Sequence, residues 1–250
     1  MTLYHHSDIV FVNGGLTLAE SITLFHGSSK IIEKPEFGKG NPRNDYGLGF
    51  YCTESLELAK EWASGNRMGG FANAYAFDIS GLSVVNLNDI QYGILDWLAL
   101  LVNNRVFGVT VPIAVEARDY LTAHFLPDVN KCDVVRGYRA DDSYFTFAMD
   151  FLSGAISLRQ LSRAMALGEL GEQLMLKSKK SFHTLQYIGS EPANGEVYYA
   201  KRRKRDNDAR DQYLKVDRYN ARRPDDLFML DILREEIKRD DTRLQRDISI

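Results

Sequence analysis

The feature that most constrains the fold is an irregular alternation of strand-like and helix-like runs. Strand-like runs, rich in β-branched and aromatic residues, occupy 20–32, 73–87 and 172–178, whereas helical spacing occupies 55–65, 89–105 and 157–168. A regular strand–helix–strand repeat, which would predict a parallel sheet covered on both faces, is not found. The sequence therefore predicts the α+β class.

Local end signals refine two of these elements. Asp89 is placed to cap the N-terminus of the helix over 89–105, and Gly65 to close the helix over 55–65. Residues 132–154 combine both kinds of run, because a short β-branched strand leads through a polar turn into an apolar helix. We expect that turn to present polar side chains.

Charge divides the chain into a body and a tail. Residues 201–250 hold 15 Lys+Arg and 12 Asp+Glu, whereas residues 1–200 hold 16 and 22. We expect an N-terminal extension (1–20), a main domain (21–195) and a charged helical extension (196–250). Leu227, Leu230, Leu233 and Ile237 share one helical face in that extension, which would pack on the body or on a partner.

The sequence "KRRKR" at 201–205 permits two interpretations. It could contact nucleic acid or an acidic partner through its positive charge. A solvated helix face is favoured, because acidic residues return at once in "DNDARDQ".

Composition limits the cellular setting and the chemistry. No apolar run approaches the roughly 20 residues of a membrane helix, and "MTLYHHSDIV" does not resemble a signal peptide. Cys52 and Cys132 stand alone, and no His-x-x-x-His pair occurs, so neither a disulfide framework nor a zinc site is predicted. We therefore expect a cytoplasmic protein with no membrane partner and no metal.

The stretch "DYGLGFYCTES" at 45–55 is the first candidate for a ligand site. Alone, its G-x-G is typical of a turn entering a strand. Neighbouring motifs support a ligand site: "LFHGSSKIIEKP" places His26 and Gly27 at the end of an earlier strand. Trp62 follows Tyr51 by eleven residues on the next helix, and Gln173 heads a late apolar strand.

In this order and spacing, the motifs resemble the ADP-ribosyltransferase superfamily, in its diphtheria-toxin-like and poly-ADP-ribose-polymerase-like branch. That branch carries His-Gly on an early strand and G-x-G-x-Tyr leading into a helix. A second aromatic lies about eleven residues later, and a glutamate starts a late strand. The chain is also similar to an uncharacterised bacterial family of that superfamily in "HGSSKIIEKP", "DYGLGFYCT", "RADDSYF" and "LGEQ". The resemblance covers residues 24 to about 190 and implies a split β-sheet core with flanking helices.

The resemblance implies NAD as co-substrate, cleaved between nicotinamide and ribose. By motif, the His26 side chain would bind a ribose hydroxyl and the Gly27 backbone the nicotinamide amide. Tyr51 and Trp62 would hold the nicotinamide ring by stacking. Gly47 and Gly49 would let the chain turn close to the ligand. The implied NAD-binding residues are His26, Gly27, Ser28, Gly49, Tyr51 and Trp62.

The late-strand glutamate is where this sequence departs from the pattern. Gln173 matches that position better than its neighbour Glu172, and a shift of one residue would exchange the two. A glutamine accepts a hydrogen bond but carries no charge. A neutral residue there favours single ADP-ribose transfer over chain elongation and calls for an acidic group from elsewhere.

Asp141 and Asp142 in "RADDSYF" could supply that acidic group as catalytic residues beside His26, Tyr51 and Gln173. The alternative is that these aspartates start a helix, where a negative charge complements the helix dipole. The sequence leaves both interpretations open.

The resemblance thus implies an NAD-dependent mono-ADP-ribosyltransferase that releases nicotinamide. Its acceptor would be a protein or a nucleic acid, as for an intracellular bacterial toxin or effector with an antitoxin or inhibitor partner. Two alternatives stay open: an NAD glycohydrolase, and a catalytically weak module that binds NAD or a protein partner.

Overall fold

The computed structural model describes residues 8–12, 15–19, 21–65, 67–105, 111–140, 142–165, 167, 171–217 and 223–246. Its strands are β1 (Asp8–Val12), β2 (Gly15–Ala19), β3 (Ser21–Ser28), β4 (Phe50–Cys52), β5 (Gly70–Asp78), β6 (Val84–Asn86), β7 (Val134–Tyr138), β8 (Glu172–Leu176) and β9 (Leu185–Ala193). Its helices are α1 (Leu56–Ala63), α2 (Ile94–Asn104), α3 (Pro112–His124), α4 (Asp142–Leu152), α5 (Leu158–Met165), α6 (Lys179–His183), α7 (Gly195–Gln212), a π-helical turn (Tyr213–Asp217), α8 (Met229–Arg234) and α9 (Thr242–Arg246).

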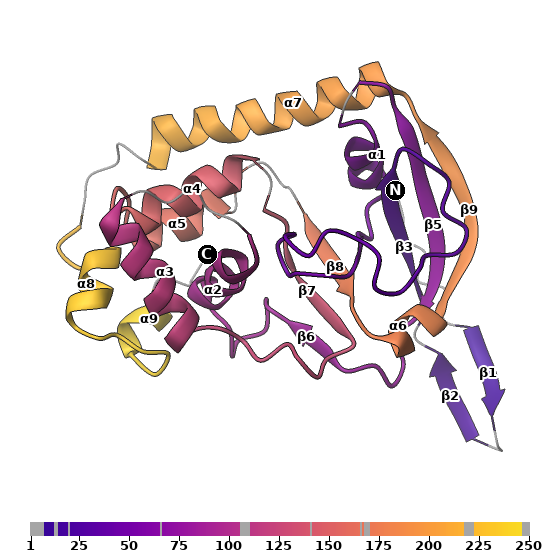
Figure 1. Cartoon of the computed structure of the whole chain (residues 1–250), viewed down its shortest axis with the longest axis horizontal. Coiled ribbons are helices and arrows are strands. Elements are labelled where there is room, and N and C mark those ends of the chain that lie inside the picture. Colours follow the sequence, from indigo (N-terminus) through magenta and orange to yellow (C-terminus); the bar gives the residue numbers. More distant parts are fainter. Residues whose placement is uncertain are drawn as a thin grey trace.

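Two sheets form the centre of the fold, and a separate hairpin pairs β1 with β2 (Figure 1). The three-stranded sheet has the antiparallel order β3–β5–β9. The four-stranded sheet has the order β4–β8–β7–β6, in which β6 and β7 are parallel and the other pairs antiparallel. Sheets and helices without a regular alternation confirm the predicted α+β class.

The two sheets meet at one antiparallel bridge and then part. The Phe25 amide donates to the Thr53 carbonyl at 2.8 Å, and the Thr53 amide donates back to Phe25 at 2.9 Å. Beyond this bridge, β3 continues through His26 to Ser28 and β4 runs back through Tyr51 to Phe50. The residues that the sequence singled out, His26, Gly27 and Tyr51, therefore lie where the sheets separate.

Two apolar clusters cover the two faces of the four-stranded sheet. The smaller cluster joins Leu24 and Phe77 of the three-stranded sheet to Cys52, Val134 and Leu174. The larger cluster packs the other face, through Val135 and Met175, against the helices. We call this second face the helix face, because strand alternation turns every other side chain of β4, β7 and β8 towards it.

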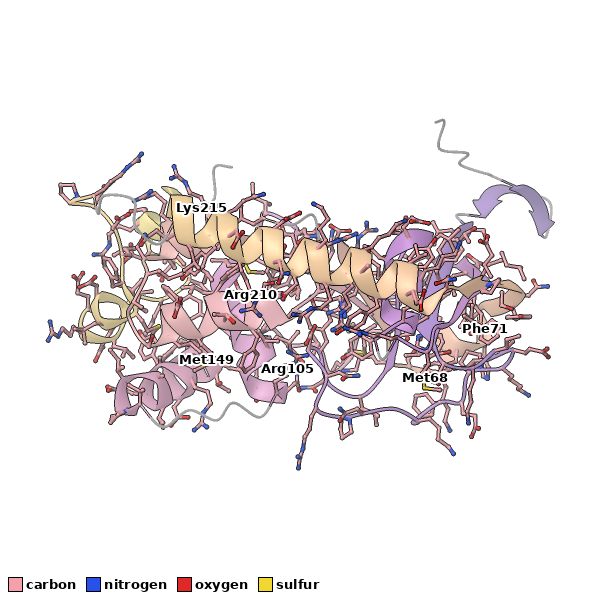
Figure 2. All side chains as sticks on the ribbon, turned by 90° about the horizontal axis from the view of Figure 1, so that it is seen from above. Met68, Phe71, Arg105, Met149, Arg210 and Lys215 are labelled. Carbon is pink, nitrogen blue, oxygen red and sulfur yellow. The ribbon has the colours of Figure 1, made fainter. Side chains whose placement is uncertain are left out.

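The charged segment after residue 195 is part of the same structure. α7 runs along the long axis of the molecule, across α1 at one end and α4 at the other (Figures 1 and 2). Further on, buried side chains join the larger cluster from Leu227, Met229, Ile232, Ile237 and Leu244. The predicted helical face from Leu227 to Ile237 is divided, since α8 ends at Arg234 and Leu230 is exposed.

One predicted helix start was wrong. The helix expected from Asp89 begins at Ile94, with Gly93 as its cap. The Asp96 carboxylate accepts a hydrogen bond from the Gly93 amide at 2.7 Å, which fixes the start four residues later. In the described part of the chain, no helix has the length and apolar character needed to cross a bilayer.

Candidate functional site

His26 lies at the point where β3 and β4 separate. Its Nδ1 is 2.7 Å from the Tyr51 carbonyl, which can only accept, so Nδ1 carries the proton. Burial lowers the pKa of His26 below 6.5, and the Phe50 ring stacks on the imidazole at 4.3 Å. The ring is therefore neutral at pH 7, and its Nε2 is a hydrogen-bond acceptor.

Asn73, from the neighbouring strand β5, fixes the backbone that follows His26. Its fully buried Nδ2 lies 3.2 Å from the His26 carbonyl, 3.1 Å from Ser28 Oγ and 3.2 Å from the Lys30 carbonyl. Its Oδ1 accepts from the Ile32 amide at 2.9 Å. Ser28, predicted to bind NAD, thus takes part in holding the segment that leaves β3.

Gly27 allows α1 to lie directly against β3. A Cβ at this position would come within 2.0 Å of the Ala59 carbonyl oxygen and 2.8 Å of the Trp62 Cβ. Only glycine permits such an approach. The sequence "HG" therefore has a packing reason, and that packing sets the predicted stacking residue Trp62 beside Gly27.

Trp62 is partly covered by a cation. The guanidinium of Arg139, which follows β7, lies 4.7 Å from the centre of the indole ring. The buried indole Nε1 has no hydrogen-bond partner in the described part of the chain. A nicotinamide ring that stacked on the covered face of Trp62 would have to displace Arg139.

The glycine stretch before β4 serves packing as well. A Cβ at Gly49 would lie 2.2 Å from Met175 Sδ, so this glycine lets the chain approach β8. The Tyr51 hydroxyl donates to the Gly47 carbonyl at 2.7 Å and accepts from the Tyr46 amide at 3.0 Å. Burial raises the pKa of Tyr51, so its phenol stays protonated and is no base.

The register of β8 separates Gln173 from Glu172. Tyr51 pairs with Met175, so Gln173, two residues away, shares the helix face with the Tyr51 side chain. Glu172 is on the opposite face, where its Oε2 accepts from Arg136 Nε at 2.6 Å. Of the two predicted candidates, Gln173 is therefore the one on the Tyr51 face, and Glu172 is held by a surface ion pair.

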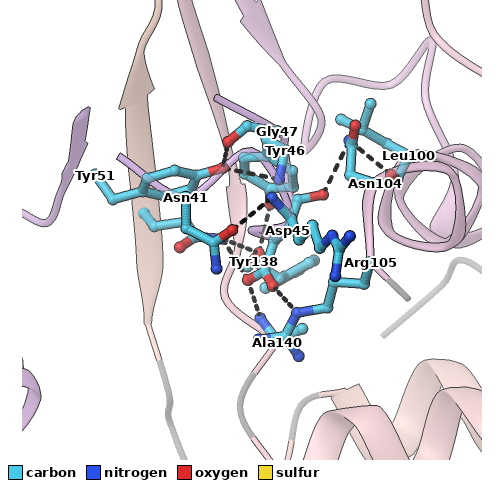
Figure 3. Close-up of polar contacts among 12 residues, drawn as sticks. Asn41, Asp45, Tyr46, Gly47, Tyr51, Leu100, Asn104, Arg105, Tyr138 and Ala140 are labelled. Carbon is cyan, nitrogen blue, oxygen red and sulfur yellow. Dashed lines mark hydrogen bonds and ion pairs between the residues drawn. The ribbon is translucent and has the colours of Figure 1, made fainter. Parts of the chain in front are cut away.

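Asp45 belongs to the site, although it was not among the residues that the sequence predicted. This carboxylate is only 5% exposed. Its Oδ2 accepts from Gln173 Nε2 at 2.9 Å. Figure 3 shows its other two partners: Oδ2 also accepts from the Ala140 amide at 2.9 Å, and Oδ1 lies 2.9 Å from Arg105 Nε. The available signal was position: Asp45 opens the "DYGLGFY" stretch.

Next to Asp45, the Tyr138 carbonyl accepts hydrogen bonds from three donors. They are the Tyr46 hydroxyl, Trp97 Nε1 at 3.1 Å and Gln173 Nε2 at 3.3 Å. Burial and the Asp45 charge raise the pKa of Tyr46, so its phenol also stays protonated. Asp45 is thus the carboxylate in direct contact with Gln173, within a network of neutral hydrogen-bond donors and one cation, Arg105.

The predicted acidic pair is only partly described. Asp141 lies outside the described residues, as does the side chain of Asp142. The backbone of Asp142 starts α4, as the helix-start interpretation predicted. A catalytic role for either residue stays a prediction. Among the described residues, no three His, Cys, Asp or Glu side chains form a group that could bind a metal.

Comparison with known proteins gives one result at the level of family. No curated protein and no solved structure matches the chain. A family model described as "Protein of unknown function (DUF3990)" matches residues 22–187, a range that includes β4, β8 and all of β3 after Ser21, with His26, Asp45, Tyr51 and Gln173. Because the match spans more than half of the sequence, the chain belongs to the DUF3990 family.

Proposed function

We propose that this protein is an NAD-dependent mono-ADP-ribosyltransferase. The nicotinamide leaves with the electron pair of its bond to ribose, and an acceptor atom of a protein or nucleic acid forms the new bond and loses a proton. The observation that carries the proposal is the neutral His26 at the separation of β3 and β4, 2.7 Å from the Tyr51 carbonyl. Trp62 of α1 lies beside Gly27, and Gln173 of β8 lies on the Tyr51 face of the sheet.

In this proposal His26 positions the ribose. Its Nδ1 proton is committed to Tyr51, so Nε2 accepts a hydrogen bond from a ribose hydroxyl. The half-buried, uncharged imidazole also avoids placing a second positive charge near a sugar that becomes positive in the transition state. His26 therefore acts by orientation and not as an acid.

The nicotinamide would lie against the Gly27 backbone and the Trp62 ring. Aromatic stacking of this kind contributes about 0.5–1.5 kcal/mol beyond the buried area. Tyr51 would line the same site from β4, its ring held by the hydroxyl contacts to Tyr46 and Gly47. Arg139 would move off the indole as the ligand enters.

The direct test is release of nicotinamide from NAD, followed by mass spectrometry. His26→Asn keeps a donor near the Nδ1 position and removes the Nε2 acceptor, so we expect a rate loss of about tenfold or more. His183→Asn is the control, because His183 is exposed on α6. Equal rates for the wild type and His26→Asn, with both folded, would contradict the assigned role.

A second pair of variants tests the strand assignment. Gln173→Ala should reduce nicotinamide release, whereas Glu172→Gln on the opposite face should leave it close to the wild-type rate. The reverse result would assign the site to the other face of β8.

The lack of a charge on Gln173 favours one alternative, a module that binds NAD without consuming it. Calorimetry that detects NAD binding, together with no nicotinamide release in buffer or lysate, would support that module over the transferase. Labelled NAD incubated with lysate distinguishes transfer from hydrolysis, because hydrolysis gives free ADP-ribose alone.

A further inference from the structure

Asp45 is held in the interior of the protein, whereas Glu172 is held by an ion pair at the surface. The Asp45 carboxylate lies beneath the glycine stretch, between the end of β7 and Gln173, and is almost fully buried. Burying a carboxylate is costly unless hydrogen bonds and an opposite charge compensate it. Here two N–H donors reach Oδ2, and Arg105 supplies the opposite charge at Oδ1 (Figure 3).

Oδ1 itself remains incompletely satisfied. Arg105 Nε is 2.9 Å away, yet its N–H is not aligned for a hydrogen bond, and Oδ1 has no other partner in the described part of the chain. Asp45 thus keeps one buried carboxylate oxygen that lies beside a cation but accepts no hydrogen bond. Such a group needs an explanation beyond anchoring a loop.

The same contacts determine how Gln173 is oriented. Its amide nitrogen faces two acceptors, Asp45 Oδ2 at 2.9 Å and the Tyr138 carbonyl at 3.3 Å. The opposite amide orientation would place the Oε1 oxygen against both acceptors, which is unfavourable. Nε2 is therefore committed to the protein, and Oε1 is the atom left to accept a hydroxyl group.

We propose that Asp45 is a positioning residue, which fixes Oε1 of Gln173 towards the ribose of NAD and supplies the negative charge that a glutamine lacks. This inference rests on the proposed function. The hydrogen bond from Nε2 to the carboxylate makes Oε1 a stronger acceptor, because the amide is polarised. Asp45 and Gln173 together thus stand in for a single glutamate.

A charge exchange tests this directly. Asp45→Asn removes the charge, and we expect kcat for nicotinamide release to fall about 10²-fold. We expect KM for NAD to change by less than about threefold, since the lost interaction belongs to the transition state. The double variant Asp45→Asn/Gln173→Glu returns a carboxylate to the pair from the other side, so it should recover at least about tenfold of that loss.

A second test measures kcat of Gln173→Glu alone over a range of pH. This variant keeps Asp45 and its contacts with the Ala140 amide and Arg105. Two carboxylates in hydrogen-bond contact share one proton at low pH, and that proton replaces the amide hydrogen. At higher pH both ionise and repel each other. The kcat of this variant relative to wild type should therefore fall by about tenfold or more between about pH 6 and about pH 8.

The two phenols near position 173 do not change charge in that range. Burial raises the pKa of Tyr46 and of Tyr51, so both phenols stay neutral. Arg105 lies beside Asp45 in the wild type and in the variant alike. A pH dependence specific to Gln173→Glu can then be assigned to the carboxylate pair.

The outcomes separate the two proposals. An active wild type with an equally active Asp45→Asn, or a double variant no better than Asp45→Asn, overturns the role of Asp45 alone. A kcat ratio for Gln173→Glu that stays constant with pH overturns it as well. A folded wild type that never releases nicotinamide overturns the proposed function and this inference with it. Thermal melting establishes that each variant is folded.

Discussion

At the scale of single residues, the protonation of His26 makes the stability of the protein depend on pH. Burial lowers its pKa below 6.5, so the native protein binds fewer protons than the unfolded chain as the pH approaches that value. The stability from this group is fully present above pH 6.5 and is lost as pH falls through the lower native pKa. We therefore expect urea unfolding of the wild type to show a loss of stability on acidification.

His26→Asn provides the comparison for this pH effect. It retains a donor towards the Tyr51 carbonyl but has no group that titrates in this range, so its free energy of unfolding should depend less on pH. The two proteins are compared by urea unfolding at about pH 7.5 and about pH 5. Identical losses in both would show that His26 does not carry the effect.

Gly27 gives a second prediction at this scale. In Gly27→Ala the new Cβ would lie 2.0 Å from the Ala59 carbonyl oxygen, which is backbone and cannot rotate away. We expect α1 to move off β3 and the protein to lose about 1–3 kcal/mol of stability by thermal or urea unfolding.

Gly65→Ala is the matched control for Gly27→Ala. The nearest atom to its Cβ is Arg202 Nη1 at 3.1 Å, the mobile end of a long side chain. We expect a change within about 0.5 kcal/mol. An equal loss in both variants would refute the packing explanation for the "HG" motif.

At the scale of elements, the basic sequence 201–205 attaches α7 to α1. Arg205 Nη2 lies 2.6 Å from Oε1 of the buried Glu61, and Lys201 Nζ lies 2.7 Å from Glu57. Lys204 instead pairs with Asp208 on α7 itself. The favoured interpretation, a solvated helix face, therefore holds only in part, because Lys201 and Arg205 bind the body of the protein.

The ion pairs of α7 differ in burial, and their stabilities should differ accordingly. Arg205→Ala leaves the Glu61 carboxylate, 3% exposed, without its partner, and we expect a loss of about 1–3 kcal/mol. Lys204→Ala breaks a pair whose side chains are 77% and 50% exposed, so its effect should stay within about 0.5 kcal/mol. Urea unfolding of both variants measures the difference, and equal effects would contradict it.

What the sequence could predict follows from which interactions are local. Helix α1 and strands β3, β5 and β8 have clear periodicity, so their existence was predictable. Asp45 was not, because its partners Arg105, Ala140 and Gln173 are distant in sequence and meet only through the sheet register. The start of α2 was misplaced because Asp96 competes with Asp89 as the capping carboxylate.

At the scale of the whole molecule, the tail connects the two halves of the fold. α7 contacts α1, which covers the three-stranded sheet, and α4, which belongs to the helical side (Figure 1). After α7, the Arg159–Asp226 pair at 2.7 Å and the Arg239–Asp96 pair at 2.6 Å attach the following segments to α5 and α2. The expected boundary near residue 195 therefore does not mark the end of the hydrophobic core.

Removal of the tail tests this directly. Among the described residues, a chain ending at residue 194 loses four large side chains with at most 2% exposure, Tyr213, Met229, Ile232 and Ile237. At about 1.5–3 kcal/mol for each buried apolar side chain, the loss approaches the roughly 5–15 kcal/mol that stabilises a typical protein. We expect this shortened chain to show no cooperative thermal transition by circular dichroism.

Removal of the other end is the control. The hairpin pairs β1 with β2, while β3, β5 and β9 form their sheet with each other. A chain that starts at Ser21 behind an initiator methionine should therefore retain a cooperative transition. If the chain without the tail also unfolds cooperatively, the body carries its own core and the tail is a separate attachment. If only the chain without the hairpin does so, then the body, with the site at the separation of β3 and β4, depends on the tail for a stable core.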